Sequence, residues 1–418
     1  MRPVILCGGD SSRLWPLPKP KQFQKVFNSS NTMLKDTLLR LKKDYKSPII
    51  TTNAQYKSLV MQDLHDLEDY RVILEPVKIG TAAAILIAAL ISDENEVMLV
   101  LPSDHFIGNL NNFHFSVDKA CQIVRKTDAI VTFGVRYNEF NPEYGYINAS
   151  YDCNNECHIV HNFLEKPAHE LKDYNYWNSG IFVLRAGRYI DEIKKLAPDL
   201  YELYSASFVQ EEKFYYLNKQ DFEQVQNISI DHLVMEKTQN VAMIEADFDW
   251  VDVGTWNAML ELSRREELLA KIEFTSNLKP RVTSKVLHKS LISFINKIKD
   301  IKVIKTEAKP WGFFDIVLVG SNFLVKYLFI NPLSCTSKQF HNYRDEYHIV
   351  LSGVGHVGLN DKVYAVEPNH VVEIPRYTSH RIQNKNANLP LEIIEFQVGE
   401  YLSDDDIVRL EDLYGRTA

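Results

Sequence analysis

Residues 8–23 read GGDSSRLWPLPKPKQF and directly follow the short apolar run PVILC at residues 3–7. The small residues at positions 8–12 let backbone N–H groups approach an anion closely, as phosphate-binding loops require. Arg13 and Lys21 add two positive charges, since arginine can grip a phosphate with two parallel hydrogen bonds and lysine acts as a point charge. The run is therefore a candidate phosphate-binding loop at the end of a first strand. A surface turn with solvated cations is the alternative.

Short apolar runs alternate with helical patterns through the first half of the chain. Besides residues 3–7, the runs at 48–52, 71–75, 97–101 and 129–135 are typical of buried strands, and helical patterns lie near 55–67, 80–92 and 113–126. This alternation predicts an α/β fold, with a sheet that carries helices on both faces. Ligands of such sheets bind at the carboxyl ends of the strands, which places Gly8, Gly9, Glu75 and Asp104 near one crevice.

The second half changes character. We expect a connector at residues 263–308, where the stretch 271–308 holds nine Lys/Arg and three Asp/Glu. From about residue 309, β-rich segments at 322–330, 346–351, 354–359, 371–374 and 391–398 are separated by turn residues. They predict an all-β domain, either a small barrel or a double-sheet jelly roll.

The composition of the 418 residues, 45% hydrophobic and 24% charged, is that of a globular protein of two or three domains. A net charge of −8 argues against an extended nucleic-acid-binding surface. The longest apolar run, Thr81–Ile91, is shorter than the ~20 residues that cross a bilayer, and no leader peptide is visible. Five cysteines do not make a disulfide scaffold in a chain of this length. We therefore expect a reduced, cytoplasmic protein without nucleic-acid or membrane partners.

Taken whole, residues 8–23 resemble the signature of sugar-nucleotide pyrophosphorylases, and RLWP followed by PKQF resembles the mannose-1-phosphate guanylyltransferase branch. Further segments resemble this family in its order: EP at 75–76 with GTA at 80–82, LPSDH at 101–105, YGYI at 144–147, EKP at 165–167, WNSG at 177–180, SIDHLVMEK at 229–237 and WVDVGTW at 250–256. Each residue alone has a structural alternative, such as a cap, a turn or a surface ion pair. So many segments in one order make coincidence a poor explanation.

The resemblance implies a Rossmann-like nucleotidyltransferase domain at residues 1–262, built on a mixed, mostly parallel sheet. This domain would make GDP-mannose and pyrophosphate from GTP and mannose 1-phosphate. The resemblance implies catalytic roles for Arg13, Lys21, Asp104 and Asp252, the last two binding Mg²⁺. It implies nucleotide binding by Gly8, Gly9, Ser11, Ser12, Glu75 and Thr81, and sugar-phosphate binding by Gly145, Glu165, Lys166 and Asn178. The residue types suit this chemistry, because nucleotidyl transfer needs in-line positioning and charge neutralisation rather than a covalent nucleophile. Carboxylate oxygens suit Mg²⁺.

Four side chains of the β-rich region have the spacing of a metal site: Gln339, His341, Glu346 and His380. Gln339 and His341 lie two apart and so face the same side of a strand, while the other two come from later strands. Two imidazoles, a carboxylate and an amide oxygen suit Zn²⁺ or another divalent metal, although a single histidine is more often structural.

These spacings resemble a cupin, and the chain from KPWG at 309–312 to YGR at 414–416 resembles the isomerase half of bifunctional mannose-6-phosphate isomerase/mannose-1-phosphate guanylyltransferases. The resemblance implies a cupin (jelly-roll) domain at residues 309–418 that interconverts fructose 6-phosphate and mannose 6-phosphate. A metal there would polarise the carbonyl while a base moves a proton between neighbouring carbons. It also implies a homo-oligomer.

The sequence departs from the family pattern in several places. Ser11-Ser12 stands where the family has Gly-Thr or Gly-Ser, the loop is about three residues shorter, and Gly80 replaces an asparagine on the base side. Two histidines that flank the metal ligands in the family are missing. Two alternatives therefore stay open: a guanylyltransferase with an inactive cupin domain, and a sugar-nucleotide-binding regulatory subunit. A further candidate, Cys153 and Cys157 with two nearby histidines, reads better as a hairpin tip than as a zinc site.

Overall fold

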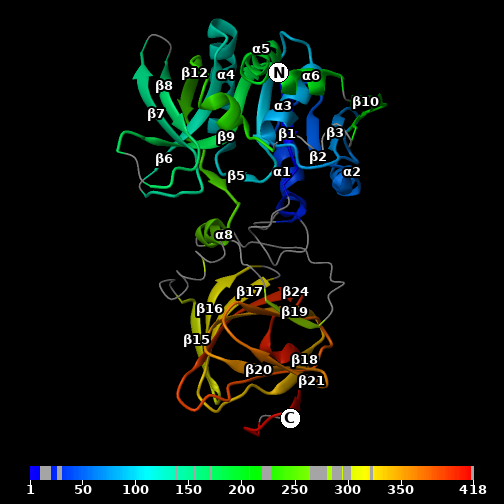
Figure 1. Ribbon diagram of the computed structural model, residues 1–418, viewed down its shortest axis with the longest axis vertical. Helices are drawn as coiled ribbons and strands as arrows, with labels where there is room; N and C mark the ends of the chain where they lie inside the picture. The colour runs from blue at the N-terminus through cyan, green and yellow to red at the C-terminus, as the bar shows by residue number, and fades with distance from the viewer. Residues whose placement is uncertain are drawn as a thin grey trace. The chain divides into compact units, whose positions relative to one another are not determined.

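The computed structural model describes residues 1–9, 20–25, 31–137, 139–153, 156–169, 172–206, 208–218, 227–263, 280–284, 294, 303–320 and 323–415. By their contacts these residues form two compact units (Figure 1). The first contains Met1–Gly9 and Met33–Asp252, and the second contains the described parts of Asp10–Thr32 and Val253–Ala418.

A mixed sheet forms the centre of the first unit (Figure 1). Its described strands, in spatial order, are β10 (Phe208–Glu211), β11 (Phe214–Leu217), β3 (Arg71–Glu75), β2 (Ile49–Asn53), β1 (Arg2–Leu6), β4 (Val97–Pro102), β9 (Tyr176–Arg185), β6 (Ile130–Arg136), β12 (Val241–Glu245), β8 (Cys157–Leu164) and β7 (Tyr146–Asp152). β3, β2, β1 and β4 are mutually parallel, whereas β9 runs antiparallel between β4 and β6. The predicted mixed α/β sheet is confirmed, and so is the hairpin at Cys153, which joins β7 to β8.

Helices cover both faces of this sheet. They are α1 (Met33–Leu39), α2 (Lys57–Asp63), α3 (Thr81–Leu90), α4 (Leu110–Thr127), α5 (Ala186–Leu196) and α6 (Pro198–Ala206). α3 reads TAAAILIAAL and packs with α5, α6 and the inward side chains Val4, Met98 and Val100 in one apolar cluster. α4 contacts β4, β6 and β9 and buries a separate stripe at helical spacing that includes Phe113, Val117 and Val124. The carboxyl ends of the parallel strands lie at one edge between these layers.

The second unit is built from two antiparallel sheets. One contains β14 (Arg281–Ser284), β22 (His370–Ile374), β19 (Arg344–Ser352), β24 (Leu391–Gly399), β17 (Phe323–Ile330), β16 (Gly312–Val319) and β15 (Lys305–Lys309). The other contains β21 (Lys362–Val366), β20 (Gly355–Leu359), β23 (His380–Gln383), β18 (Lys338–His341) and β25 (Ile407–Glu411). Leu328 and Ile393 of the first sheet pack with Val357 and Ile382 of the second. The predicted double-sheet domain is confirmed, with all five predicted strands present as β17, β19, β20, β22 and β24.

Segments outside the expected all-β region also belong to the second unit, among them β14 and α8. β14 lies in the predicted connector and pairs with β22. Trp256 begins α8 (Trp256–Ser263) and is buried, with its ring centroid 5.0 Å from that of Phe396. The chain therefore leaves the first unit after Asp252, ten residues before the predicted end of the first domain. The limits of the functional domains remain predictions.

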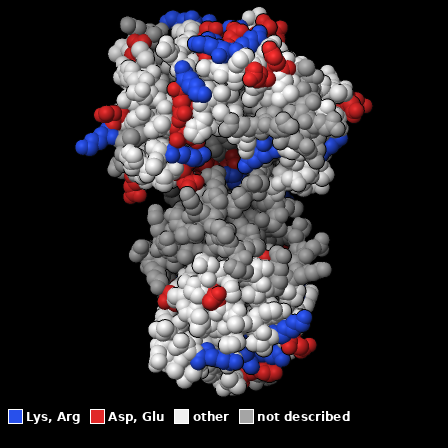
Figure 2. All heavy atoms as spheres, viewed as in Figure 1, with Lys and Arg blue, Asp and Glu red and all other residues white. Residues whose placement is uncertain are grey.

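Charged side chains of both signs are interspersed on the face of the molecule shown in Figure 2. Among the described residues, no helix is both long enough and apolar enough to cross a membrane.

Candidate functional site

A two-stranded ribbon brings together the two predicted magnesium carboxylates. β5 (His105–Ile107) pairs antiparallel with β13 (Trp250–Asp252), and Asp252 lies directly opposite His105. Asp104 immediately precedes β5, so both acids reach the same end of the ribbon. Their Oδ1 atoms lie 4.0 Å (Asp104) and 3.9 Å (Asp252) from Nε2 of His105. Both carboxylates thus lie near His105, and carboxylate oxygens are the ligands that a hard cation such as Mg²⁺ prefers.

The predicted nucleotide residues that the structure describes gather at the ends of β1 and β3. A β-carbon on Gly8 would lie 3.4 Å from Oε2 of Glu75, so the glycine permits close approach of the two segments. Burial raises the pKa of Glu75 to about 8, although the Ile79 N–H group acts in the opposite direction. The Thr81 hydroxyl accepts a hydrogen bond from the Ile230 N–H group at 2.9 Å.

The rest of the predicted loop is only partly described. Lys21 lies in the 3₁₀ turn Lys21–Phe23, which belongs by its contacts to the second unit. Arg13, Ser11 and Ser12 lie outside the described residues. The roles of these four residues remain predictions.

Strand register brings the predicted sugar-phosphate residues together. Tyr146 of β7 lies between Leu164 of β8 and Trp177 of β9. Their sequence neighbours Gly145, Glu165 and Asn178 therefore form one cluster. The Gly145 carbonyl accepts a hydrogen bond from the Asn178 N–H group at 2.8 Å. A β-carbon on Gly145 would lie 2.6 Å from Oε2 of Glu165, which explains the glycine.

Two side chains of this cluster carry opposite charges. Lys166 Nζ lies 2.8 Å from Oε1 of Glu165, and the lysine side chain is half exposed while the carboxylate is 9% exposed. Lys166 has a backbone φ of 48°, a conformation that non-glycine residues rarely adopt. Such strain is common at ligand-binding positions.

Asp231, which sequence reasoning did not single out, also belongs to this cluster. Asn178 accepts a hydrogen bond from the Thr132 hydroxyl at 2.8 Å and donates one to Oδ1 of Asp231 at 2.9 Å. Burial and the nearby Glu165 carboxylate raise the pKa of Asp231 to about 7. Asp231 begins a π-helical turn, Asp231–Met235, a feature frequent at functional sites. The segment SIDHLVMEK resembles the family and could have drawn attention to this aspartate. Only the fold shows that Asp231 contacts Asn178.

In the second unit, three of the four predicted metal ligands converge in one buried cluster. One ligand atom from each of His341, Glu346 and His380 lies within 4.8 Å of the others, and all three residues are buried. His380 Nδ1 lies 3.0 Å from the Thr378 carbonyl and must carry the hydrogen, because a carbonyl only accepts. His380 Nε2 then presents its lone pair to the cluster, where it lies 3.4 Å from Oε2 of Glu346. This tautomer and this donor set fit Zn²⁺ or a similar ion.

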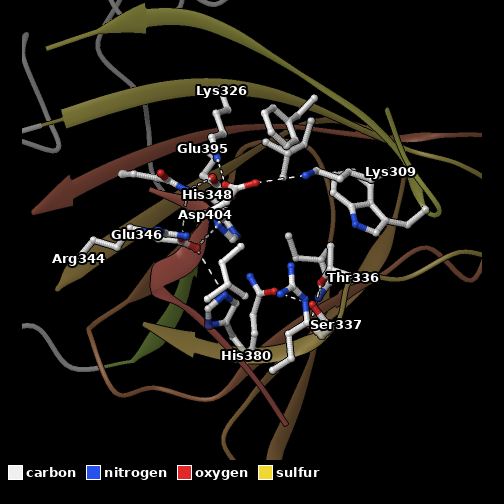
Figure 3. Close-up of a pocket in the computed structure, with 18 residues that line it drawn as sticks. Lys309, Lys326, Thr336, Ser337, Arg344, Glu346, His348, His380, Glu395 and Asp404 are labelled. Atoms are coloured by element: carbon white, nitrogen blue, oxygen red, sulfur yellow. Dashed lines mark hydrogen bonds and ion pairs between the residues drawn. The ribbon is translucent and has the colours of Figure 1, made fainter. Parts of the chain in front are cut away.

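The fourth predicted ligand, Gln339, pairs with His380 across the strands and lines the same pocket. Its Oε1 accepts a hydrogen bond from the Ser337 hydroxyl at 2.6 Å. Arg344 is also buried here, with Nε 3.0 Å from Oε1 of Glu346. Figure 3 shows Glu346, His348 and His380 pointing into this pocket, with Arg344 and Lys309 on opposite sides.

A row of charged side chains that the sequence did not reveal runs beside the metal cluster. Strand pairing aligns Lys326 of β17 with Glu395 of β24, and Glu395 with His348 of β19. His348 Nε2 lies 3.2 Å from Oε2 of Glu346 and 3.1 Å from Oε2 of Glu395. Burial alone would lower the pKa of His348, but these two carboxylates raise it to about 9.

Glu346 is the shared member of this network. Burial alone would raise the pKa of Glu346, but the charge of His341 and the hydrogen bonds of His341 and His348 hold it well below its usual range. An ionised carboxylate beside two imidazole nitrogens is the arrangement that a divalent metal needs.

Comparisons with known proteins agree with the two-part fold. A family model described as nucleotidyl transferase matches residues 2–267, and one described as mannose-6-phosphate isomerase C-terminal matches residues 296–412. Fold and comparisons thus define a nucleotidyltransferase joined to an all-β domain of the mannose-6-phosphate isomerase type.

Full-length relatives narrow the class further. The chain is 32% identical to the "Mannose-1-phosphate guanylyltransferase" of Klebsiella pneumoniae over 99% of each chain. It is also 32% identical to the "Alginate biosynthesis protein AlgA" of Pseudomonas aeruginosa, over 100% of this chain and 98% of that one. The chain therefore belongs to the family of mannose-1-phosphate guanylyltransferases that carry a mannose-6-phosphate isomerase C-terminal domain, which confirms the resemblance seen in its motifs.

Solved structures are similar as well. The mannose-6-phosphate isomerase of Helicobacter pylori is 27% identical with a TM-score of 0.53, over 60% of this chain and 99% of that one. A Thermus thermophilus structure described as "mannose-1-phosphate geranyltransferase" is 26% identical with a TM-score of 0.54, over 63% of this chain and 78% of that one.

Proposed function

We propose that the first unit transfers GMP from GTP to mannose 1-phosphate, forming GDP-mannose and pyrophosphate. The sugar-phosphate oxygen attacks the α-phosphorus of GTP, and the pyrophosphate leaves from the opposite side. The convergence of Asp104 and Asp252 on His105 is the observation that carries this proposal, because it supplies oxygen ligands for Mg²⁺. Bound Mg²⁺ would neutralise negative charge on the reacting phosphates.

The protein's own residues position the two substrates. Gly8 and Gly9 leave room for the triphosphate, and the family resemblance assigns Arg13, Lys21, Ser11 and Ser12 to its binding. Glu75 and Thr81 lie on the side of the site that takes the guanine base of GTP. Lys166 offers its exposed ammonium group to the phosphate of mannose 1-phosphate. Glu165 accepts hydrogen bonds from sugar hydroxyls, and Asn178 supports the same subsite through Asp231.

The substrate proposal can be tested by pyrophosphate release with purified protein, Mg²⁺, and each combination of four nucleoside triphosphates with mannose, glucose and galactose 1-phosphates. We expect GTP with mannose 1-phosphate to give the highest kcat/KM. Faster release with another pair would contradict the proposed substrates. Tight binding of GDP-mannose without pyrophosphate release from any pair would support a regulatory subunit instead.

For the second unit we propose metal-dependent interconversion of mannose 6-phosphate and fructose 6-phosphate. His341, Glu346 and His380 hold Zn²⁺ or another divalent ion, with Gln339 as the additional ligand. The metal would polarise the substrate carbonyl. Lys309 and Lys326, which line the same pocket, supply positive charge for the substrate phosphate.

This second activity is tested by incubating fructose 6-phosphate with the metal-loaded protein and with protein treated with a chelator. We expect mannose 6-phosphate only from the metal-loaded sample. Stoichiometric metal binding without isomerisation would support a guanylyltransferase with an inactive cupin domain.

A further inference from the structure

His105 lies at the meeting point of the two candidate metal carboxylates. It follows Asp104 directly and is paired with Asp252 across the β5–β13 ribbon. Its Nε2 atom lies about equally far from the two carboxylates, at 4.0 and 3.9 Å, and its side chain is only 9% exposed. The imidazole therefore stands between two like charges that the proposed reaction needs close together.

Trp250 determines which ring nitrogen of His105 carries the hydrogen. The indole Nε1–H group donates a hydrogen bond to Nδ1 of His105 at 3.0 Å, and both side chains are buried. An indole can only donate, so Nδ1 must accept and the hydrogen must be on Nε2. A proton on Nδ1 would break this bond. The hydrogen is therefore on Nε2, the ring nitrogen that lies 4.0 Å from Asp104 and 3.9 Å from Asp252, which is longer than a hydrogen bond.

Neighbouring groups hold the imidazole in this orientation. The rings of His105 and Trp250 meet edge to face, with centroids 5.2 Å apart. The His105 carbonyl accepts a hydrogen bond from Arg40 at 3.2 Å. Gly180 lies alongside, where a β-carbon would be 3.7 Å from Cε1 of His105. The ring is thus fixed from several sides before any ligand arrives.

We propose that His105 is a positioning residue, whose Nε2–H group lies between Asp104 and Asp252 and favours their placement for the divalent cation by a through-space electrostatic interaction. This inference rests on the proposed guanylyltransferase function. Two carboxylates repel each other, and a neutral N–H group between them offsets that repulsion without adding a charge that would compete with the metal. Because each carboxylate has two oxygens, one can face His105 while the other binds the cation. Trp250 acts one step further out, by fixing the tautomer.

The first test measures Mn²⁺ binding to the full-length protein by electron paramagnetic resonance. The Asp252→Asn variant reports Mn²⁺ binding at other sites, including the cluster of His341, Glu346 and His380, and this background is subtracted. Glutamine can place an N–H group where His105 has Nε2–H, whereas leucine cannot. We expect His105→Leu to weaken Mn²⁺ binding by tenfold or more and His105→Gln by less than threefold. The exposed His65→Leu variant is the matched control and should bind like the wild type.

Kinetics separate positioning from a general structural effect. In His105→Leu, the Mg²⁺ concentration that gives half-maximal rate should rise at least tenfold, while kcat at saturating Mg²⁺ should fall less than threefold. Equal Mn²⁺ affinity in His105→Leu and the wild type would overturn the proposal. So would a loss of kcat at saturating Mg²⁺ without a change in metal dependence.

The second test reads the tautomer of His105 directly, a property that can be measured without activity and without metal. Nitrogen-15 NMR of the imidazoles, with His105 assigned by its absence in His105→Gln, should show the hydrogen on Nε2 in the wild type. In Trp250→Phe we expect a shift toward the Nδ1–H tautomer together with weaker Mn²⁺ binding. An Nδ1–H tautomer in the wild type would contradict the proposal. If Asp252→Asn kept full transferase turnover, the metal assignment of the proposed function would fail instead, so the two failures can be told apart.

Discussion

At the scale of single residues, Lys166 illustrates how the fold prepares a charge for a ligand. Its backbone is held at a φ of 48°, while its N–H group donates to the Tyr144 carbonyl at 3.2 Å. The ammonium group pairs with the nearly buried Glu165 yet stays half exposed. An exposed ion pair contributes little to stability, so the value of this arrangement lies in what the lysine can bind.

We therefore predict that Lys166→Met raises the KM for mannose 1-phosphate at least tenfold, since a charged hydrogen bond to phosphate is worth roughly 1.5–3 kcal/mol. The KM for GTP should change less than threefold. Initial-rate kinetics with each substrate varied in turn provide the measurement. Lys195→Met, an exposed lysine on α5, is the control. Equal effects on both KM values would argue against a sugar-phosphate role.

Glu75 gives a prediction about pH. Burial raises its pKa from 4.5 to about 8 in the folded protein. The unfolded chain therefore releases this proton at lower pH than the folded protein does. The contribution to stability is fully present below 4.5 and is lost as the pH rises through 8, at roughly 1.4 kcal/mol per unit between these values.

Glu75→Gln removes this titration while keeping the size of the side chain. Between pH 5 and 8, the unfolding free energy of the wild type should fall relative to that of Glu75→Gln, as measured by denaturant unfolding of the first unit. Parallel pH profiles for the two proteins would show that Glu75 is not held protonated by burial.

At the scale of elements, Gly80 shows why one departure from the family pattern is tolerated. It precedes α3 with a φ of 86°, and a β-carbon there would lie 2.3 Å from the Ile228 carbonyl oxygen. The close approach lets the Ala82 N–H group donate to that oxygen at 3.2 Å. In this chain the backbone conformation itself requires glycine.

Gly80→Ala should lower the stability of the first unit by about 2 kcal/mol or more, because the left-handed conformation and the clash both act against it. Gly9→Ala is the matched control, since a β-carbon at Gly9 meets nothing within 4 Å among the described residues. Thermal unfolding of both variants provides the comparison. A loss in Gly80→Ala no larger than that in Gly9→Ala would refute this explanation.

Strand register explains what could and could not be predicted from the sequence. The apolar runs that became β1, β2, β3, β4 and β6 were visible because buried parallel strands are continuously apolar. The positions of Glu75 and Asp104 could also be predicted, because ligands of such sheets bind at the carboxyl ends of the parallel strands. Asp231 and His348 were missed because their partners, Asn178 and Glu395, are set by helix placement and strand pairing. Neither pairing leaves a local signal in the sequence.

At the scale of the whole molecule, the two candidate sites lie in different units. Asp104 and Asp252 belong to the first, while His341, Glu346 and His380 belong to the second. The double-sheet architecture of the second unit was predictable from period-two patterns and turn residues. Its full extent was not, because β14 and Trp256 join it from segments without a clear β pattern.

This separation predicts that the two activities can be removed independently. Glu346→Gln should lower isomerisation at least a hundredfold and reduce bound metal, because the carboxylate is the one anionic member of its ligand cluster. GDP-mannose synthesis in the same variant should stay within twofold of the wild type. Parallel assays of both reactions, with metal analysis of each sample, measure this. A joint loss of both activities would contradict independent sites.

The central claim is that Asp104 and Asp252 form the metal site of a GDP-mannose synthase. The most direct measurement is the rate of GDP-mannose formation from GTP, mannose 1-phosphate and Mg²⁺ by Asp252→Asn, with circular dichroism as a check on folding. Asparagine keeps the size of the side chain but removes its charge. We predict a folded protein whose turnover is lower by a thousandfold or more, and near-normal turnover in that variant would contradict the account.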